Sequence, residues 1–256
     1  MDTATADAVV GVARGGQILR EAAVEPDSEG RPRHSRVLLG EVERCAEAAG
    51  GWAEVDRIAV GIGPGSYTGL RIGIATARAL AQARRLPLAG VGSLAALAHG
   101  IAEHPEAGGR PLLPVIDARR GQVFAALYKT GRSSPDETGG SSRSPLASAE
   151  RPRILDCEEL WEPLVADPAE LAERLTELEA SPLAAGDGAV RFRPEFEAAG
   201  VTVAPSEAPV HGISARDVCA LGESTAEAPP DRIEPVYLRP PDAKRWLQRD
   251  RRWPGG

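Results

Sequence analysis

Residues 60–73 read VGIGPGSYTGLRIG, and five of them are glycine. An apolar stretch at 57–62 leads into this segment, and an apolar stretch with helical spacing follows it over about 70–84. This order predicts a buried strand, a glycine-rich turn and a helix. Because backbone N–H groups at such a turn can bind an anion, the segment is also the first candidate for a functional site.

Two known kinds of glycine-rich site do not fit the segment. A P-loop needs glycine, four residues and then Gly-Lys-Ser/Thr, but Thr68 stands five positions after Gly63 and the first lysine is Lys129. A hydrolase nucleophile elbow, Gly-x-Ser-x-Gly, would need glycine where Pro64 stands. We predict a structural turn, with an anion site as the alternative, formed by Gly63, Gly65, Ser66, Thr68, Gly69 and Arg71. At least one of its three glycines should have a positive φ or pack too closely for a Cβ.

The rest of the chain alternates short apolar strands with helices. Strands are predicted at 8–13, 17–24, 57–62, 87–91, 112–117, 122–128 and 183–185. Helices are predicted at about 36–49, capped by Ser35, at 94–99, capped by Ser93, and at 169–178, 193–199 and 214–221, with a turn at 186–188. This alternation predicts an α/β fold with partly parallel sheets.

Composition excludes several classes of protein. With 42% hydrophobic and 26% charged residues the chain is of ordinary globular type, and its net charge of −7 argues against nucleic-acid binding by bulk electrostatics. Three scattered cysteines, Cys45, Cys157 and Cys219, suit reduced thiols better than a disulfide framework. No apolar run is long enough to span a membrane and no secretory leader is recognised, so a cytoplasmic protein is expected.

Catalytic and metal sites lack the necessary residue patterns. His99 and His104 are five positions apart, which places them on different faces of a helix, and His34 reads as the neighbour of a helix cap. A peptidase would need a nucleophile with a base, or a metal pair. We therefore assign no catalytic residue, no metal ligand and no cofactor.

Two aspartates stand at corresponding places in the chain. Asp2 and Asp117 each precede a short turn and an apolar strand. We interpret this as a weak internal repeat, the sign of two related halves, with two unrelated hairpins as the alternative. In the helix after the glycine turn, Gly73, Ala77 and Ala81 are four positions apart and form a ridge of small residues. Such a helix is buried in its own core or against a partner.

Four segments together resemble the TsaB family, also called YeaZ. The long motif at 60–73 continues as Ala75, Thr76 and Ala77, and three shorter segments agree with the family pattern: 2–5, 34–35 and 117–123. The resemblance is good over about residues 1–128. It implies an actin-like ATPase (ASKHA) fold with two related halves, each with a mixed sheet and flanking helices.

The resemblance also implies a function without catalysis. A TsaB subunit pairs with TsaD, which transfers threonylcarbamoyl to adenosine 37 of tRNAs reading codons that begin with A, and the ATPase TsaE joins the pair. It implies tRNA contact through the complex, no membrane, and pairing through the first two helices, with a homodimer possible alone. The implied interface residues are Leu38, Val42, Cys45, Leu70, Gly73, Ile74, Ala77 and Ala81. The alternative is a kinase-like or peptidase-like enzyme of the same superfamily, with Asp2 and Asp117 as its carboxylates.

This interpretation divides the chain into three parts. Residues 1–110 form the first subdomain with the glycine motif and the partner helices, and 111–238 form the second, with an insertion at about 130–153 that reads as disordered. Residues 239–256 form a tail with six basic and two acidic residues. Its tryptophans, Trp246 and Trp253, stand among the basic residues, which indicates either RNA contact or a frayed, solvated tail.

Overall fold

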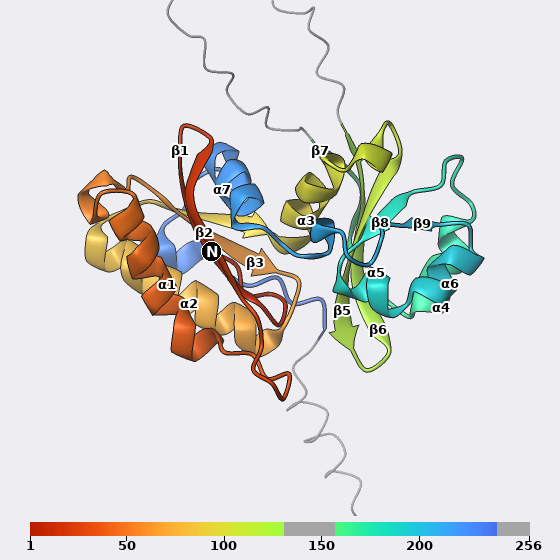
Figure 1. The fold of residues 1–256 in the computed structure, drawn as a ribbon, viewed down its shortest axis with the longest axis horizontal. Coiled ribbons are helices and arrows are strands. Elements are labelled where there is room, and N and C mark those ends of the chain that lie inside the picture. The colour runs from red at the N-terminus through yellow and green to blue at the C-terminus, as the bar shows by residue number, and fades with distance from the viewer. Residues whose placement is uncertain (131–156, 240–256) are drawn as a thin grey trace, which may run out of the picture.

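The computed structural model describes residues 1–130 and 157–239. Two regions of sheet lie side by side, with α3, Ser93–Ala102, between them (Figure 1). The prediction of a mixed α/β fold is confirmed. Nearly all of the predicted insertion at 130–153 and of the predicted tail at 239–256 falls outside the described residues.

The first region contains two separate two-stranded sheets. The antiparallel hairpin β1–β2 comprises Ala8–Arg14 and Gln17–Val24, and β3 and β4, Ile58–Gly63 and Leu88–Gly92, are parallel. Met1 and Asp2 lie between the two sheets. Asp2 exchanges two backbone hydrogen bonds with Val9 of β1, at 2.8 and 2.9 Å, and the Met1 carbonyl accepts from the Gly61 amide of β3 at 2.9 Å.

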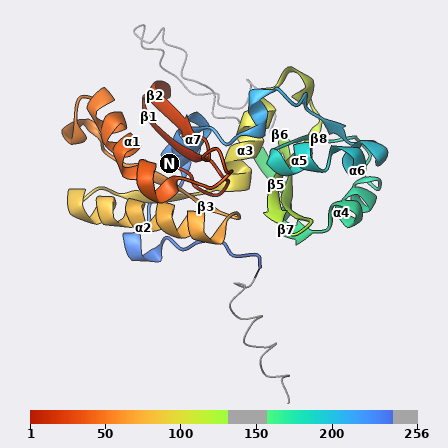
Figure 2. The ribbon, with the colours of Figure 1, turned by 60° about the horizontal axis from the view of Figure 1, so that its bottom comes forward.

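Two long helices lie beside each other in this region. They are α1, His34–Ala48, and α2, Tyr67–Arg84 (Figures 1 and 2). α7, Ala215–Ser224, packs on β1 and β3, although it belongs to the predicted second subdomain of 111–238. The segment after α7 continues along this region, where the Val236 amide donates to the carbonyl of Ile62 at 2.8 Å. The far C-terminal part of the described chain therefore completes the first region.

The second region has one continuous sheet of five strands in the order β7-β6-β5-β8-β9. β5, Pro111–Arg119, and β6, Gln122–Thr130, form an antiparallel hairpin, and β7, Cys157–Ala166, pairs antiparallel with β6. β8, Leu183–Ala185, is parallel to β5, and β9, Thr202–Val203, is parallel to β8. α4, Pro168–Leu175, α5, Asp187–Arg191, and α6, Arg193–Ala198, surround a second apolar core that includes Phe196 and Leu171.

Several predicted boundaries were wrong. α1 begins at His34, so Ser35 is an exposed residue of its first turn and no side chain caps it. α2 begins three residues early, because the Ser66 hydroxyl accepts the Gly69 amide and starts the helix. Ser93 is the first residue of α3, and its cap position is Gly92. Of the predicted turn at 186–188, only Gly186 precedes α5, and the other two residues begin that helix. The strand β7 was missed.

Among the described residues, no helix is both long and apolar enough to cross a membrane. α3, the most apolar of the helices, has only ten residues, and it is buried between the two regions of sheet.

Candidate functional site

The glycine turn closes around the first four residues of the chain. Several of its amides donate to groups of the protein itself: Ser66 N–H to the Ala4 carbonyl at 2.7 Å and Gly63 N–H to the Ser93 hydroxyl at 3.2 Å. The Thr3 hydroxyl donates to the Gly69 carbonyl at 2.8 Å. The turn and the N-terminal aspartate segment, 60 residues apart in sequence, therefore form one packed unit.

Close approach explains why this unit requires glycine. A Cβ on Gly69 would lie 2.1 Å from the Thr3 carbonyl oxygen, and a Cβ on Gly65 would lie 2.4 Å from that of Ala4. Gly63 has φ +97°, in the region that favours glycine. These are the features that the sequence analysis expected of at least one of the three glycines.

The remaining residues assigned to the turn play different parts. Ser66 caps α2, and Thr68 is exposed in its first turn. Arg71 lies over the Tyr67 ring, 4.8 Å from its centroid, and that ring lies 4.9 Å from the ring of Tyr237. The sequence did not single out Tyr237, because only the fold brings the end of the described chain beside α2.

Asp2 is fully buried at the base of this unit. Its carboxylate accepts the Ala4 amide at 2.7 Å and the hydroxyl of Ser93 at 2.7 Å. Burial raises the pKa of Asp2, and these two hydrogen bonds oppose part of that shift. Sequence reasoning missed Ser93 as a partner of Asp2 and treated it only as a helix cap.

Asp117 has a different environment. It follows the buried part of β5, and its Oδ2 accepts from Arg191 at 2.9 Å and from Arg119 at 3.3 Å, both of which are largely exposed. The backbone amide of Asp117 donates to Asp187, and burial raises the pKa of that neighbouring carboxyl. That Asp2 and Asp117 occupy corresponding places in two related halves stays a prediction.

The eight residues predicted to contact a partner are buried inside the chain itself. Leu38, Val42 and Cys45 of α1 are 2–6% exposed, and on α2 Leu70, Ile74, Ala77 and Ala81 are at most 3% exposed. A Cβ on Gly73 would lie 2.3 Å from the Thr3 hydroxyl. Their small and apolar side chains therefore belong to the core, and the small-residue ridge packs within the chain rather than against a partner.

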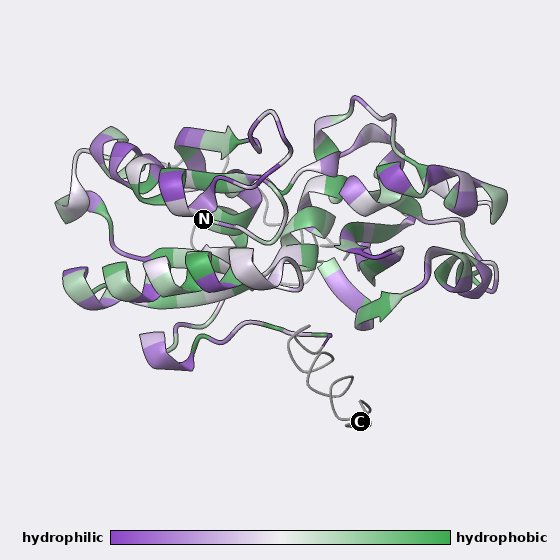
Figure 3. Cartoon of the chain, turned by 90° about the horizontal axis from the view of Figure 1, so that it is seen from below, coloured by the Kyte–Doolittle hydropathy of each residue, from purple (hydrophilic) through white to green (hydrophobic). Residues whose placement is uncertain are grey.

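The opposite faces of the same helices are open to solvent. On α2 they carry Ala75, Ala79 and Ala83, and on α1 Gly40 and Leu39, whose side chain is 55% exposed. This surface, which we call the α1–α2 outer face, has few charges along α2 (Figure 3). It is a candidate interface, and it lies on the faces of the two helices opposite the eight buried residues.

The histidines of the described chain have structural partners. The buried His34 Nε2 lies 3.0 Å from the Ala6 carbonyl oxygen, and the buried His99 Nδ1 lies 2.8 Å from Asp217. His211 Nδ1 accepts the Gly186 amide at 3.1 Å. Within residues 1–130 and 157–239, no three histidine, cysteine or acidic side chains gather as metal ligands would.

Comparison with known proteins identifies the family. The family model described as "TsaD: tRNA N6-adenosine threonylcarbamoyltransferase" matches residues 24–158, just over half of the chain. Proteins named TsaB match the chain over shorter stretches: that of Bacillus subtilis is 42% identical over 80 residues, and that of Escherichia coli is 37% identical over 97. The chain belongs to the TsaB (YeaZ) family.

Solved structures of the family extend this similarity to almost the whole chain. A Pseudomonas aeruginosa protein described as similar to the peptidase YeaZ has a TM-score of 0.69 and 25% identity, with 93% of this chain and 97% of that one covered. In sequence the match is shorter. An uncharacterized Mycobacterium leprae protein is 31% identical over 72% of this chain, which spans about half of that relative and 31–41% of the two TsaB proteins.

Proposed function

We propose that this protein is a non-catalytic partner subunit in the biosynthesis of threonylcarbamoyladenosine in tRNA. Relatives that carry the TsaB name are described as proteins of that biosynthesis, and the matching family model is described as the transferase TsaD. The partner is a TsaD-like subunit, a TsaE-like ATPase joins the pair, and tRNA contacts the assembly. Alone, the chain forms a homodimer or remains a monomer.

The observation that carries this proposal is the packing of the glycine turn against the first four residues of the chain. A strand–turn–helix that binds a phosphate must present free N–H groups to it. Here the amides of Gly61, Gly63, Ser66 and Gly69 already donate to Met1, Ser93, Ala4 and Ser66. Because Thr3 and Ala4 occupy the space beside the turn, it supports the structure of the subunit instead of holding a nucleotide.

The fold assignment is part of the same proposal. We assign the chain to the actin-like ATPase class, with related halves at about 1–110 and 111–238. The two regions of sheet support it, because both combine an antiparallel hairpin with parallel strands. The packing of α7 on β1 and β3 places part of 111–238 with the first half in space.

The α1–α2 outer face is the surface we assign to the partner. Exposed alanines along α2 allow another helix to approach closely, and Leu39 offers an apolar side chain for burial. Complex formation with a purified TsaD-like protein, measured by size-exclusion chromatography and titration calorimetry, tests this assignment.

Ala79→Glu should weaken pairing by at least ~10-fold, because it brings a charge into a dry contact. Circular dichroism should show an unchanged fold, since Ala79 is exposed. Ala198→Glu, at an exposed alanine of α6 in the second region, is the matched control and should pair normally. If Ala79→Glu pairs as tightly as this control, the interface lies elsewhere. If the unaltered chain does not pair at all, the partner function itself is wrong.

A further inference from the structure

The last residues of the described chain join the two regions of sheet, on the lower side of Figure 1. The Val236 amide donates to the carbonyl of Ile62 in β3, and the Arg239 guanidinium donates to the Ala118 carbonyl of β5 at 2.9 Å. Tyr237 lies between these two anchors. The tip of the β5–β6 hairpin and the N-terminal end of α2 are therefore held beside one short segment of chain.

Two tyrosines and an arginine form a stack at the end of α2. The rings of Tyr67 and Tyr237 lie 4.9 Å apart, and the Arg71 guanidinium lies 4.8 Å from the centroid of the Tyr67 ring. The two tyrosines stay 37% and 40% exposed. A further planar group can therefore stack on Tyr237, and nucleobases are planar groups that exposed aromatic side chains bind in this way.

Four arginines share the tip of the β5–β6 hairpin: Arg119, Arg120, Arg191 and Arg239. The Asp117 carboxylate, only 5% exposed, binds Arg119 and Arg191 through one nitrogen each. Since a guanidinium carries five N–H groups, donors remain for a second anion. The charge that this tip presents to solvent is positive, although the whole chain has a net charge of −7.

The backbone at the tip indicates that these arginines are present for their side chains. Arg119 and Arg120 have φ values of +63° and +59°, a conformation that glycine adopts freely and that a residue with a Cβ disfavours. Both side chains are exposed, so packing in the core does not explain the choice of residue. Arginine in this strained conformation points to a contact outside the chain.

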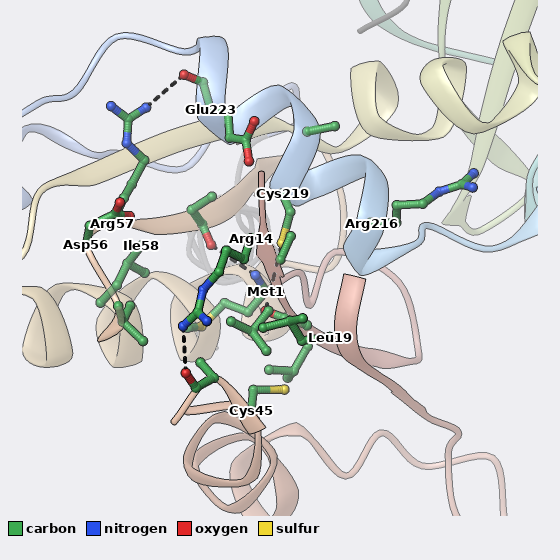
Figure 4. A pocket seen from close by; sticks show the side chains of 18 of the residues that line it. Met1, Arg14, Leu19, Cys45, Asp56, Arg57, Ile58, Arg216, Cys219 and Glu223 are labelled. Atoms are coloured by element: carbon green, nitrogen blue, oxygen red, sulfur yellow. Dashed lines mark hydrogen bonds between the residues drawn. The ribbon is translucent and has the colours of Figure 1, made fainter. Parts of the chain in front are cut away.

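The groove between β1 and β3, with a volume of about 810 Å³, differs from this surface (Figure 4). Its arginines, Arg14 and Arg57, donate to backbone carbonyls and pair with two glutamates, Glu54 and Glu227. Each positive charge in the groove is thus balanced by a partly or largely exposed negative one. The hairpin tip is therefore the better site for an anionic partner.

We propose that the tyrosine pair and the hairpin tip form one surface that binds unpaired nucleotides of RNA. Phosphates lie against the guanidiniums of Arg119, Arg120 and Arg191, and one base stacks on the ring of Tyr237. The nucleotides are unpaired because bases inside an A-form helix present no free face to a ring. This inference rests on the proposed function, in which tRNA contacts the assembly, and it gives this chain an RNA contact of its own.

Binding of a labelled single-stranded RNA of about ten nucleotides to the full chain, measured by fluorescence anisotropy, tests the proposal. Arg120→Gly should weaken binding by at least ~3-fold and reduce the slope of log Kd against log salt by roughly 0.7, as for one lost phosphate contact. Its Tm should not fall, because glycine suits the backbone there. The matched control is Arg85→Gly, at an exposed arginine with φ +57° at the far end of α2, and it should bind RNA normally.

Tyr237→Leu should weaken RNA binding by at least ~5-fold and leave the salt slope unchanged, because it removes a stacking ring and no charge. The same RNA annealed to its complement, and a free mononucleotide, should each bind at least ~3-fold more weakly than the single strand. Thermal unfolding of each variant checks that the fold is kept.

Three results would overturn the proposal: an unaltered chain that does not bind the single strand, variants at 120 and 237 that bind as tightly as Arg85→Gly, or a loss at 120 without a loss at 237. The last result would indicate a site for an acidic peptide or free phosphate. Size-exclusion chromatography with the TsaD-like protein is run in parallel. Pairing without RNA binding would contradict this inference alone, and RNA binding without pairing would contradict only the proposed partner function.

Discussion

The two regions of sheet hold their aspartates in opposite ways. In the first region Asp2 is sealed from solvent and bonded by one hydroxyl and one backbone amide, Ser93 and Ala4. In the second, the Asp117 side chain is also only 5% exposed, but its carboxylate is bound by two largely exposed arginines, Arg119 and Arg191. One region thus holds a buried aspartate with uncharged partners, and the other holds a buried aspartate with two cationic partners that reach it from the surface.

A shared feature of the two regions makes this difference informative. In both regions, glycines that follow a parallel strand pack on the backbone beside the aspartate. After β3, Gly69 packs against Thr3, next to Asp2. After β8, Gly186 packs against Val115 and Gly188 against Ile116, next to Asp117. The backbone framework is therefore common to the two regions. What differs is the set of side chains around each carboxylate, and that set decides how each region responds to mutation and pH.

The largest expected effect comes from the shared glycines. Gly69→Ala should lower the free energy of unfolding by about 3 kcal/mol or more, because its Cβ would overlap the Thr3 carbonyl. Gly188→Ala should be similarly costly, with a Cβ 2.9 Å from backbone and side-chain atoms of β5. Gly40→Ala is the helical control: its Cβ would meet only an arginine tip at 3.9 Å. The free energy of unfolding of this variant should rise by about 0.5–1 kcal/mol.

Urea denaturation of the three variants measures these changes. A tolerated Gly69→Ala beside a damaging Gly188→Ala would show that the two packings are not equivalent. The conclusion that the two regions share one backbone framework would then be wrong.

The groups that hold the two carboxylates should differ in importance. Ser93→Ala removes a hydroxyl from a buried carboxylate and should lower the free energy of unfolding by about 1.5–3 kcal/mol. Arg191→Ala removes one of two cationic partners, itself half exposed, and should lower the free energy of unfolding by less than about 1 kcal/mol, since Arg119 remains. Thermal unfolding of both variants at pH 7 decides the order. A larger loss for Arg191→Ala would contradict the contrast between the two sites.

The smallest expected effect is a change in pH dependence. Because burial raises the pKa of Asp2, the folded protein holds a proton that the unfolded chain releases, so this carboxyl favours folding less as pH rises above about 4. Asp2→Asn removes that contribution. The stability of the unaltered chain minus that of the variant should therefore fall between about pH 4 and 7, as measured by urea denaturation at several pH values.

Asp117→Asn, which replaces the arginine-bound carboxylate of the second region, is measured alongside as the matched variant. If the subunit is non-catalytic, both variants that fold should leave the activity of the complex with the TsaD-like protein unchanged. A difference that rises with pH for Asp2→Asn would contradict the assigned effect of burial.

The sequence by itself determined the local elements and the motif. Apolar periodicity and glycine-rich turns located the hairpins at 8–24 and 112–128, the strand before the glycine turn, and the helix after it. These signals act over a few neighbouring residues. They missed β7, whose residues are largely exposed on one side and follow a polar stretch. They also placed α1 and α2 correctly while misplacing the start of each.

Only the tertiary structure decided which faces of those helices are buried and what the glycines contact. Gly73, Ala77 and Ala81 are equally suited to a partner or to the chain's own core, and the strands beneath α2 decide for the core. Gly69 packs on Thr3, Ser93 bonds to Asp2, and α7 packs on β1. The partners in these contacts are separated in the sequence by 66 to more than 200 positions. Such contacts arise from the packing of whole elements, and local sequence carries no signal for them.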